Sequence, residues 1–491
     1  MSAPATIRRR LFLLDDIEME ETAPSALEVR ASQLAHRAPV RLDGVTPALA
    51  TALEALRQGA SLEELAPGVL AAEGVDALAR LHQCVARLQQ SAMLGQRLLL
   101  GDQVLAALRP LSAFYVAGGQ SPDAARPLVL SRFALCRNAG NRLVLESPRG
   151  YAEIELVAPA AHRAVLELTR PRRAADLAAT IEGLSVEAAA ALLALFAAAA
   201  AVVPVNDDGR TEESTLPELA PWAFHDLYFH SRSRLGRHAN PYGGTYPFEN
   251  VFEPLPVVKP AMSDRRIELF RPDLDALASE DLPFTRVLET RRSRRRHGDP
   301  PISLQQLGEF LYRSARIQHM VEDAGVSFRP SPAGGAIHEL EIYALVTRCT
   351  GLEPGSYHYD PAAHRLTVLD GKPAYVKAVL DMAAITAQLD EPPQVLLVYT
   401  ARFQRMQLKY ESMAYAATLK HVGALFQTMY LVATAMGLAP CALGGGHADL
   451  FARAVGLDPY AEASVGEFIL GSAAPDEEVA AAIRPLGQRT P

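Results

Sequence analysis

Residues 409–446 read KYESMAYAATLKHVGALFQTMYLVATAMGLAPCALGGG. Within this run, apolar side chains recur at alternating gaps of four and three residues, at Tyr415, Leu419, Val422, Phe426, Met429, Ala433 and Met436. That spacing lies along one stripe of a helix, so the pattern predicts a helix over residues 415–436. Gly437, directly after it, is typical of a helix C-terminus.

A second row of residues lies beside this stripe, at Ala416, Gly423 and Tyr430. The predicted apolar face is therefore wide, and its small residues would let a second helix approach closely. This face is wider than a single contact with the core requires. The pattern therefore predicts a homodimer interface that includes this helix. The alternative is that the stripe only packs inside the core, as most such stripes do.

The residues on either side of this helix suggest one wall of a cofactor site. Lys409 and Tyr410 precede the helix, and a short extended segment, residues 439–443, follows it. That segment runs into the glycine turn 444–446, where bare backbone N–H groups would approach whatever the turn faces. Lys409 and Tyr410 by themselves would be surface residues more often than catalysts.

The composition is that of an ordinary globular protein. A length of 491 residues exceeds the usual size of one core and predicts two to four domains. The 48 Lys and Arg against 56 Asp and Glu argue against a dedicated nucleic-acid binder. The longest apolar run, residues 188–203, is mostly alanine and falls short of the roughly 18 residues of a membrane-spanning helix.

The cysteine pattern and the first residues bear on the compartment. The four cysteines lie far apart and form no CxxC pair, so we expect neither a disulfide framework nor a metal site. The first residues contain no signal-peptide core. A reducing cytoplasm fits both features.

The first 205 residues contain an internal repeat with an interval of 112 positions. Val45-Thr46-Pro47 and Val157-Ala158-Pro159 each open a predicted helix with proline in its first turn. Each unit contains two strand-like runs and a long final helix, at 27–30, 40–42 and 75–93, and at 143–145, 152–156 and 186–201. This order predicts two tandem winged-helix-like domains, residues 1–110 and 111–205.

A winged helix can read DNA, but these two units lack a basic reading helix. The candidate helix of the first unit carries Glu63 and Glu64, and the basic run 170–173 of the second unit precedes a mostly alanine helix. We therefore expect no nucleic-acid binding. The pattern is similar to the small domains that clasp the leader peptides of ribosomally made, modified peptides between a strand edge and a helix.

The rest of the chain divides into an arm and a larger domain. Residues 206–260 begin as a polar linker and become rich in aromatic residues, so we expect this arm to pack across the domain that follows. Residues 261–491 alternate helices and strands and predict an α+β domain. Its expected helix is 302–314, and its expected strands are 340–346, 357–359, 366–369, 395–400 and 468–470.

Two further segments of this domain carry polar chemistry. Residues 291–296 read RRSRRR, and guanidinium groups beside a serine hydroxyl suit a phosphate. Such a run alone is more often a solvated patch. Residues 329–335 read RPSPAGG, which places a hydroxyl and two glycines before a strand. As a lone motif this segment is an ordinary turn.

Together these segments resemble the flavin-dependent nitroreductase superfamily, and within it the azoline dehydrogenases of the streptolysin S-type and cyanobactin thiazole oxidases. The resemblance rests on the order of Arg-Arg-Ser-x-Arg at 291–295, Pro-Ser-Pro-x-Gly-Gly at 330–335, the Lys409-Tyr410 pair, the long helix, the glycine connection and the aromatic arm 222–246. Many relatives have an arginine shortly after the Lys-Tyr pair, where this chain has Ser412 and Met413.

The resemblance implies an α+β fold with a nitroreductase-like FMN domain behind the two winged-helix-like domains. It implies that a peptide thiazoline or oxazoline loses an α-proton and a hydride, so that an aromatic azole results, with FMN supplying the redox chemistry. Lys409 and Tyr410 would be catalytic. The implied cofactor-binding residues are Arg291, Arg292, Ser293, Arg295, Pro330, Ser331, Gly334, Gly335, Leu443, Gly444 and Gly445.

The same resemblance implies partners. These are an azoline-containing precursor peptide, a cyclodehydratase that makes the azolines, and a second copy of the chain with FMN at the dimer interface. Two other functions stay open. One is an NAD(P)H-dependent nitroreductase acting on small molecules, and the other is a non-catalytic scaffold that brings a peptide to partner enzymes.

Overall fold

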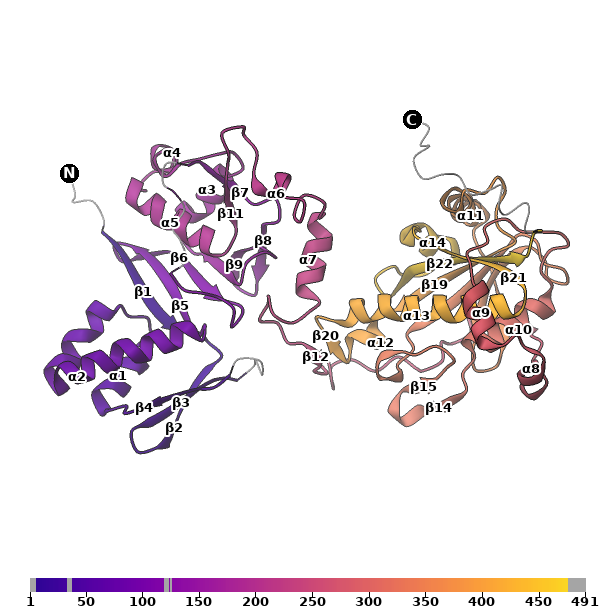
Figure 1. Ribbon diagram of the computed structural model, residues 1–491, viewed down its shortest axis with the longest axis horizontal. Coiled ribbons are helices and arrows are strands. Elements are labelled where there is room, and N and C mark those ends of the chain that lie inside the picture. The colour runs from indigo at the N-terminus through magenta and orange to yellow at the C-terminus, as the bar shows by residue number, and fades with distance from the viewer. Residues whose placement is uncertain (1–5, 33–37, 119–122, 124–125, 476–491) are drawn as a thin grey trace. The chain divides into compact units, whose positions relative to one another are not determined.

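The computed structural model describes residues 6–32, 38–118, 123 and 126–475, which form two compact units divided between Tyr242 and Gly243 (Figure 1). The ends of the predicted domains at residues 1 and 491 lie outside the described residues. Among the helices in the described ranges, none has the length and apolar character needed to cross a bilayer.

The first unit is built on a six-stranded antiparallel sheet in the order β1-β5-β6-β10-β9-β8. Its strands are β1 Ile7–Leu13, β5 Leu94–Leu100, β6 Gln103–Pro110, β8 Leu135–Ala139, β9 Arg142–Glu146 and β10 Ala152–Leu156. Two smaller sheets contain β2 Ile17–Ala23, β3 Ala26–Ala31 and β4 Val40–Asp43, and β7 Leu128–Leu130 with β11 Val202–Pro204. These strands include those expected in both repeats.

The helices of the first unit pack around two separate cores, one centred on Leu53 and Leu81 and the other on Leu177 and Phe196. The helices are α1 Pro47–Ala55, α2 Leu62–Gln90, α3 Pro159–Glu167, α4 Ala174–Thr180, α5 Val186–Ala198, α6 Glu212–Thr215 and α7 Phe224–Arg232. Gly74 interrupts α2 with φ of +82°, which confirms the predicted break before residue 75.

Strands from both sides of the predicted boundary at residue 110 belong to one sheet, because β6 pairs with β10. Pro110 lies opposite Ala152 in this pairing. Each half therefore has its own core but shares the sheet with the other half. The assignment of the two halves as winged-helix-like domains stays a prediction.

The arm expected over residues 206–260 is divided between the two units. Arg232 Nη2 donates to the buried Glu146 Oε2 at 2.6 Å, and Arg237 Nη1 donates to the backbone oxygens of Pro148 and Arg149. Residues 206–242 of the expected arm therefore belong to the first unit, and residues 243–260 belong to the second. The physical reason is that the Glu146 carboxylate is buried and needs charged partners.

The second unit is built on a seven-stranded antiparallel sheet in the order β13-β18-β17-β16-β19-β22-β21. Its strands are β13 Arg266–Glu268, β16 Leu340–Val346, β17 Gly355–Asp360, β18 Arg365–Leu369, β19 Val395–Arg402, β21 Leu438–Leu443 and β22 Glu462–Ser472. A hairpin pairs β14 His319–Val321 with β15 Val326–Phe328, and a separate two-stranded sheet pairs β12 Gly243–Gly244 with β20 Tyr410–Glu411. All five predicted strands of this domain are confirmed.

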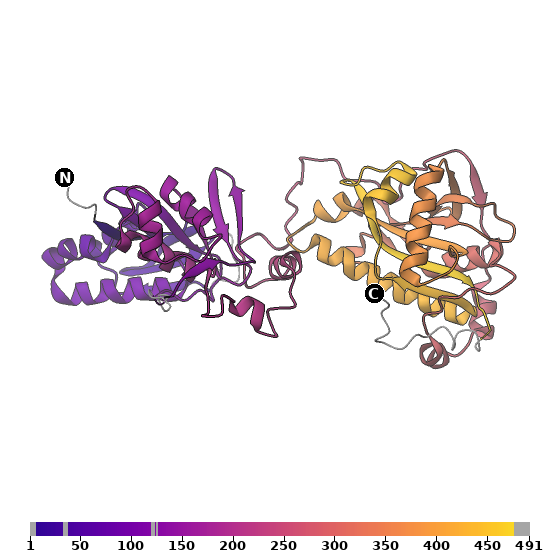
Figure 2. The same ribbon diagram turned by 90° about the horizontal axis from the view of Figure 1, so that it is seen from above.

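Helices cover both faces of this sheet, which is why β16 and β19 are buried along their whole length. The helices are α8 Leu274–Glu280, α9 Phe284–Thr290, α10 Leu304–Ala315, α11 Pro373–Ala387, α12 Phe403–Gln407, α13 Ala414–Ala435 and α14 Ala448–Val455. α10 and α13 lie on one face and α11 and α14 on the other (Figures 1 and 2). This α+β architecture confirms the predicted fold class.

α13 is the helix predicted over residues 415–436, and Gly437 ends it with φ of +67°. Its buried face differs from the predicted stripe. The side chains of Val422, Met429 and Ala433 are buried as expected, but Tyr415 and Leu419 are 46% and 39% exposed. The N-terminal half of the helix therefore presents part of the predicted stripe to solvent.

Polar residues occupy the core-facing side of α13 in this half. Thr418 and His421 are buried there and hydrogen-bond the carboxylate of Glu339, which is itself fully buried. Tyr430, predicted in the second row, is also buried. Its hydroxyl hydrogen-bonds Ser293 and the N–H of Ala442 in β21. Hydrogen bonding to buried polar groups, rather than apolar burial alone, sets the rotation of the helix.

Candidate functional site

Lys409 and Tyr410 lie where α12 ends and the short strand β20 begins. β20 pairs in antiparallel fashion with β12, so that Gly244 lies opposite Tyr410. The backbone N–H of Tyr246 donates to the carbonyl of Lys409 at 3.1 Å. The pair is thus held by a strand from a part of the chain about 165 residues earlier.

The predicted glycine segment meets this pair. Gly334 and Gly335 form a tight turn, in which Gly335 has φ of +63°. A Cβ atom added to Gly335 would lie 2.8 Å from Tyr410 Oη and 2.9 Å from Lys409 Nζ. The structure therefore brings together two of the groups predicted from sequence, with the polar ends of both side chains against the turn.

His421 and Glu339 support this turn from below. The N–H of Gly334 donates to His421 Nε2 at 2.7 Å, so the imidazole is neutral with its proton on Nδ1. Nδ1 in turn donates to Glu339 Oε1 at 2.8 Å. Burial alone would raise the pKa of Glu339, but the hydrogen bonds that its carboxylate accepts, first from His421 and then from its own backbone and Thr418, lower it below its ordinary value.

Ser331 lies beside this pair, at a small cavity of about 20 Å³. Arg329, His338, Glu339 and His421 also line the cavity, which has room for about one water molecule. Burial lowers the pKa of His338 to about 3, so its imidazole is neutral. Pro330 precedes Ser331 and is partly exposed.

The arginine segment lies at the other end of α13. Ser293 Oγ and Tyr430 Oη are 2.8 Å apart, and Tyr430 Oη accepts a hydrogen bond from the N–H of Ala442 at 2.7 Å. The Arg291 guanidinium lies 5.2 Å from the centre of the Tyr430 ring. Tyr430 therefore joins the arginine segment to β21 through its hydroxyl and its ring.

The rest of the arginine segment lies beside β21. The N–H of Arg294 donates to the carbonyl of Pro440 at 2.8 Å, and the side chains of Arg292 and Arg295 are exposed. The charge of Arg295 reaches Cys441, although burial raises the pKa of that thiol overall. The segment thus presents several guanidinium groups near one strand end.

The predicted glycine connection is only partly at this site. Gly444 and Gly445 are exposed, and a Cβ added to either would meet no other atom within 4 Å. Leu443 is buried in the core between the sheet and the helices α11 and α14. Its side chain therefore points to the face of the sheet opposite Tyr430, and only its backbone can contribute at the arginine end.

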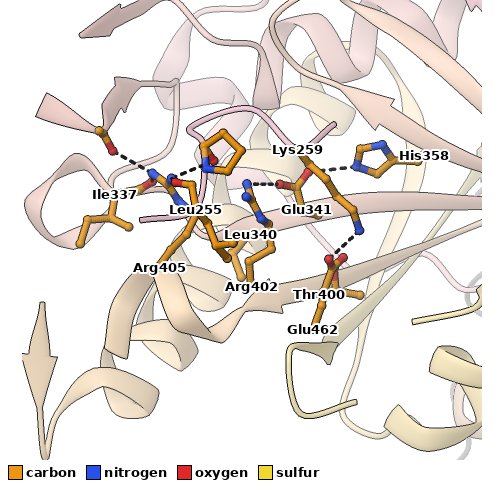
Figure 3. Close-up of polar contacts among 12 residues, drawn as sticks. Leu255, Lys259, Ile337, Leu340, Glu341, His358, Thr400, Arg402, Arg405 and Glu462 are labelled. Carbon is orange, nitrogen blue, oxygen red and sulfur yellow. Dashed lines mark hydrogen bonds and ion pairs between the residues drawn. The ribbon is translucent and has the colours of Figure 1, made fainter. Parts of the chain in front are cut away.

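A buried ion network fixes the strands that lead to Lys409 (Figure 3). Glu341 lies between His358, at 2.9 Å, and Arg402, at 3.3 Å. Glu462 accepts hydrogen bonds from Lys259 and Thr400. Because β19 carries Thr400 and Arg402, these bonds hold the strand that precedes α12.

Arg405 on α12 adds a second anchor. Its guanidinium donates to the backbone carbonyls of Leu255, Pro256, Gly325 and Ile337 at 2.7 to 3.0 Å. Burial lowers the pKa of Arg405 to about 10, which leaves it charged at neutral pH. Four carbonyls from three segments therefore converge on a residue one helical turn before Lys409.

His421, Glu339, Tyr430 and Tyr246 were missed by the sequence reasoning. A signal for His421 was present, since a histidine on an otherwise apolar helix needs a buried partner. Glu339 lies beside Glu341 at the start of an apolar strand, which was a comparable signal. The sequence contained no equivalent signal for Tyr246.

Two family models each match a part of this chain. The nitroreductase family model matches residues 288–472, and the model described as cyanobactin oxidase ThcOx matches residues 128–239. The first match covers six of the seven strands of the second sheet, α13 and all of the site residues predicted from sequence. The two matches confirm the predicted resemblance to nitroreductase-type azoline dehydrogenases.

Individual proteins are also similar to parts of this chain. A Methanocaldococcus jannaschii protein described as a candidate nitroreductase is 29% identical over 179 residues, which cover 36% of this chain and 84% of the relative. The trifolitoxin-processing protein TfxB of Rhizobium leguminosarum bv. trifolii is 26% identical over 142 residues, 28% of this chain and 38% of that protein. The chain thus spans well under half the length of TfxB.

Solved structures also resemble the chain. A nitroreductase candidate from Ralstonia eutropha is 23% identical with a TM-score of 0.35, covering 48% of this chain and 100% of the other. The E. coli microcin synthetase McbBCD complex contains a chain that is 19% identical with a TM-score of 0.33. That match covers 50% of this chain and 87% of the other.

Proposed function

We propose that this chain is an FMN-dependent dehydrogenase that oxidises peptide thiazolines or oxazolines to azoles during the biosynthesis of a ribosomally made, modified peptide. One observation carries the proposal: Lys409 Nζ and Tyr410 Oη meet at the Gly334–Gly335 turn inside a nitroreductase-family domain. The cyanobactin oxidase match and the trifolitoxin-processing relative support a peptide substrate.

The described residues fit FMN, which carries a phosphate at one end and a planar ring at the other. Arg291, Arg295 and Ser293 offer cationic and hydroxyl donors for the phosphate. The turn beside Lys409 offers backbone without side chains for the ring. His421 and Tyr430 at the two ends are nine residues apart on α13, about 14 Å along the helix.

The open faces of Gly444 and Gly445 add to this fit, because a ligand could reach their backbone N–H groups. We place Arg292, Ser331, Pro330 and the backbone of Leu443 at the same cofactor site. When bound, FMN supplies the two-electron acceptor of the reaction. The protein residues then have to orient the azoline and remove a proton.

Lys409 and Tyr410 are suited to that proton transfer. Oxidation of an azoline to an azole removes one proton and one hydride from adjacent ring atoms. We assign the proton to Lys409 as general base, with Tyr410 donating a hydrogen bond to the ring nitrogen or relaying the proton. Because Gly335 has no side chain, the polar ends of both groups can lie directly against this turn.

The experiment that tests the function uses the purified full chain. A yellow protein that converts a thiazoline-containing peptide to a product lighter by two hydrogen atoms, with bleaching of the flavin before oxygen is admitted, supports the proposal. The relative described as a candidate nitroreductase favours a second function, reduction of small nitroaromatics by NAD(P)H. NAD(P)H consumption with a nitroaromatic and no azole product would replace the first function with the second.

We further propose that the first unit binds the precursor peptide. A groove of about 780 Å³ lies between α1 and the strands β2 and β3, with Met19, Leu27 and Ala50 among its apolar lining residues. An extended peptide could lie there and place apolar side chains into the groove. A cyclodehydratase that makes the azolines is the expected partner enzyme.

The groove has a direct test with a labelled precursor peptide. The Ala50→Trp substitution would fill the groove and weaken peptide binding by at least about tenfold, while Ala72→Trp, at an exposed position of α2, would leave it unchanged. Fluorescence anisotropy measures both. Equal peptide affinity of the two variants, or tight binding of duplex DNA by the chain, would contradict the assignment.

A further inference from the structure

The arm segment 243–246 crosses the Lys409–Tyr410 pair through backbone and side-chain bonds. Gly243 and Gly244 lie opposite Glu411 and Tyr410 in the β12–β20 pairing. Tyr246 follows, and its N–H donates to the Lys409 carbonyl. Thr245 Oγ1 donates to Glu411 Oε2 at 2.6 Å. The candidate base is therefore held by the arm as well as by its own domain core.

The ring of Tyr246 lies close to the charged end of Lys409. Lys409 Nζ is 5.7 Å from the centre of the Tyr246 ring and 5.5 Å from the centre of the Tyr410 ring. Both distances are within the range of a cation–π attraction. Gly335 also lies next to Lys409 Nζ, so the neighbours of this nitrogen are two aromatic rings and a glycine turn.

The backbone of Tyr246 is in a conformation that a bulky residue seldom adopts. Its φ is +53°, in the left-handed region. Two hydrogen bonds hold it there, one from its own N–H to Lys409 and one from the N–H of Glu249 to its carbonyl at 3.1 Å. The two hydrogen bonds fix the left-handed backbone of Tyr246 and with it the direction of its side chain. Such unusual backbone conformations are common at functional sites.

We propose that Tyr246 is a positioning residue, whose ring holds the end of the Lys409 side chain over Gly335 beside Tyr410. The arm strand β12 is then a structural part of the catalytic site. The catalytic consequence rests on the proposed azoline dehydrogenase function, whereas the placement of Lys409 rests on the contacts alone. The contact with Lys409 uses the ring of Tyr246 and not its hydroxyl. A phenylalanine at this position should therefore preserve the placement of Lys409.

The placement is tested without any turnover, by acetylating the full chain with limiting acetic anhydride and quantifying modified lysines by mass spectrometry. The Tyr246→Ala variant should raise modification of Lys409 relative to Lys377, an exposed lysine of α11, by about two- to fivefold. Tyr246→Phe and the control Tyr460→Ala, at a side chain that is 92% exposed, should not change it. Unchanged labelling in Tyr246→Ala would overturn the proposal.

The catalytic consequence has its own readout. With a thiazoline peptide, Tyr246→Ala should lower kcat by about 10- to 100-fold at unchanged KM and unchanged flavin content, and Tyr246→Phe should restore the rate. If Tyr246→Ala changes the labelling of Lys409 but the wild-type protein does not oxidise azolines, the proposed function is refuted and the placement of Lys409 by Tyr246 stands. Changed labelling with wild-type kcat in Tyr246→Ala would refute the positioning role.

Discussion

Lys409 and Tyr410 direct their polar ends to the same glycine, although neighbouring residues in a strand normally point to opposite faces. The arrangement is possible because Lys409 precedes β20 and its long side chain turns back, while Ser412 after the strand has φ of +59°. Two groups able to bind and transfer a proton therefore share one small volume. A base and a hydrogen-bond donor at the same glycine can act on one ring.

The first prediction concerns this pair. Lys409→Ala and Tyr410→Phe should each lower azole formation by about 10²–10⁴, the usual range for a lost general acid or base. Both variants should stay folded and yellow, because neither side chain belongs to the arginine end of the site. Single-turnover flavin bleaching measures the rate, with Lys377→Ala and Tyr460→Phe as controls. Near-normal rates in both site variants would exclude the assignment.

A second residue-scale prediction concerns His297, which packs against Gly471 on β22 and accepts a hydrogen bond from the N–H of Gln394 at 3.2 Å. Burial, assisted by the charge of Arg348, lowers its pKa from 6.5 to about 4. The unfolded chain therefore binds a proton that the folded chain excludes between these values. Stability is full above pH 6.5 and falls as the pH drops toward 4.

From this shift we expect the free energy of opening of β21 and β22 to fall by about 2 kcal/mol between pH 7 and pH 5. Hydrogen–deuterium exchange of these strands, corrected for intrinsic rates, measures it. His297→Phe should flatten the dependence, whereas His225→Asn, at an exposed histidine of the first unit, should not. An identical pH dependence in His297→Phe would show that other groups cause it.

At the scale of elements, α13 joins the two ends of the candidate site. His421 in its N-terminal half bonds the glycine turn, and Tyr430 in its C-terminal half bonds the arginine segment and β21. A single rigid helix therefore sets the separation between the expected phosphate and ring positions. Shifts of α13 would disturb both ends at once.

The arginine segment provides the element-scale prediction. Arg291→Ala combined with Arg295→Ala should weaken FMN retention without unfolding the protein, since each charge-assisted phosphate contact contributes on the order of 1.5–3 kcal/mol. Flavin absorbance after extensive dialysis measures the retained cofactor. Arg265→Ala, at an exposed arginine paired with Asp370, is the control. A double variant that keeps its full flavin would place the phosphate elsewhere.

At the scale of the whole molecule, the outward side of α13 provides a surface for a second copy of the chain. Tyr415 and Leu419 are exposed there, and Gly423 leaves this side of the helix bare. Tyr415 and Leu419 belong to the predicted stripe and Gly423 to the row beside it, and the core uses none of the three. We propose that they contribute to a homodimer interface.

We therefore expect light scattering to show a flavin-loaded dimer at micromolar concentration. Leu419→Glu should shift the protein to monomer, because it places a charge in the proposed apolar contact. Ile385→Glu, at a 75% exposed position of α11, should leave the dimer intact. A flavin-loaded wild-type monomer would contradict the proposal.

The sequence alone determined the local elements of the catalytic domain. The periodicity of residues 415–436 and the branched, apolar run of β19 depend on neighbours within one or two turns, so they can be read directly. The nitroreductase-like domain and its arginine, glycine and Lys-Tyr segments followed from their order along the chain. The predicted helices and strands of this domain were confirmed, and the roles of the arginine, glycine and Lys-Tyr segments in binding and catalysis stay predictions.

Only the tertiary structure decided which of these segments meet. The Glu339–His421–Gly334 hydrogen bonds join α13 to the segment 334–339, and Tyr246 reaches Lys409 across more than 160 residues. The shared sheet of the first unit and the division of the arm between the two units likewise depend on contacts between residues that are distant in the sequence. Such contacts arise from the hydrogen-bonding needs of buried polar groups and unpaired strands, and those needs have no fixed spacing in the sequence.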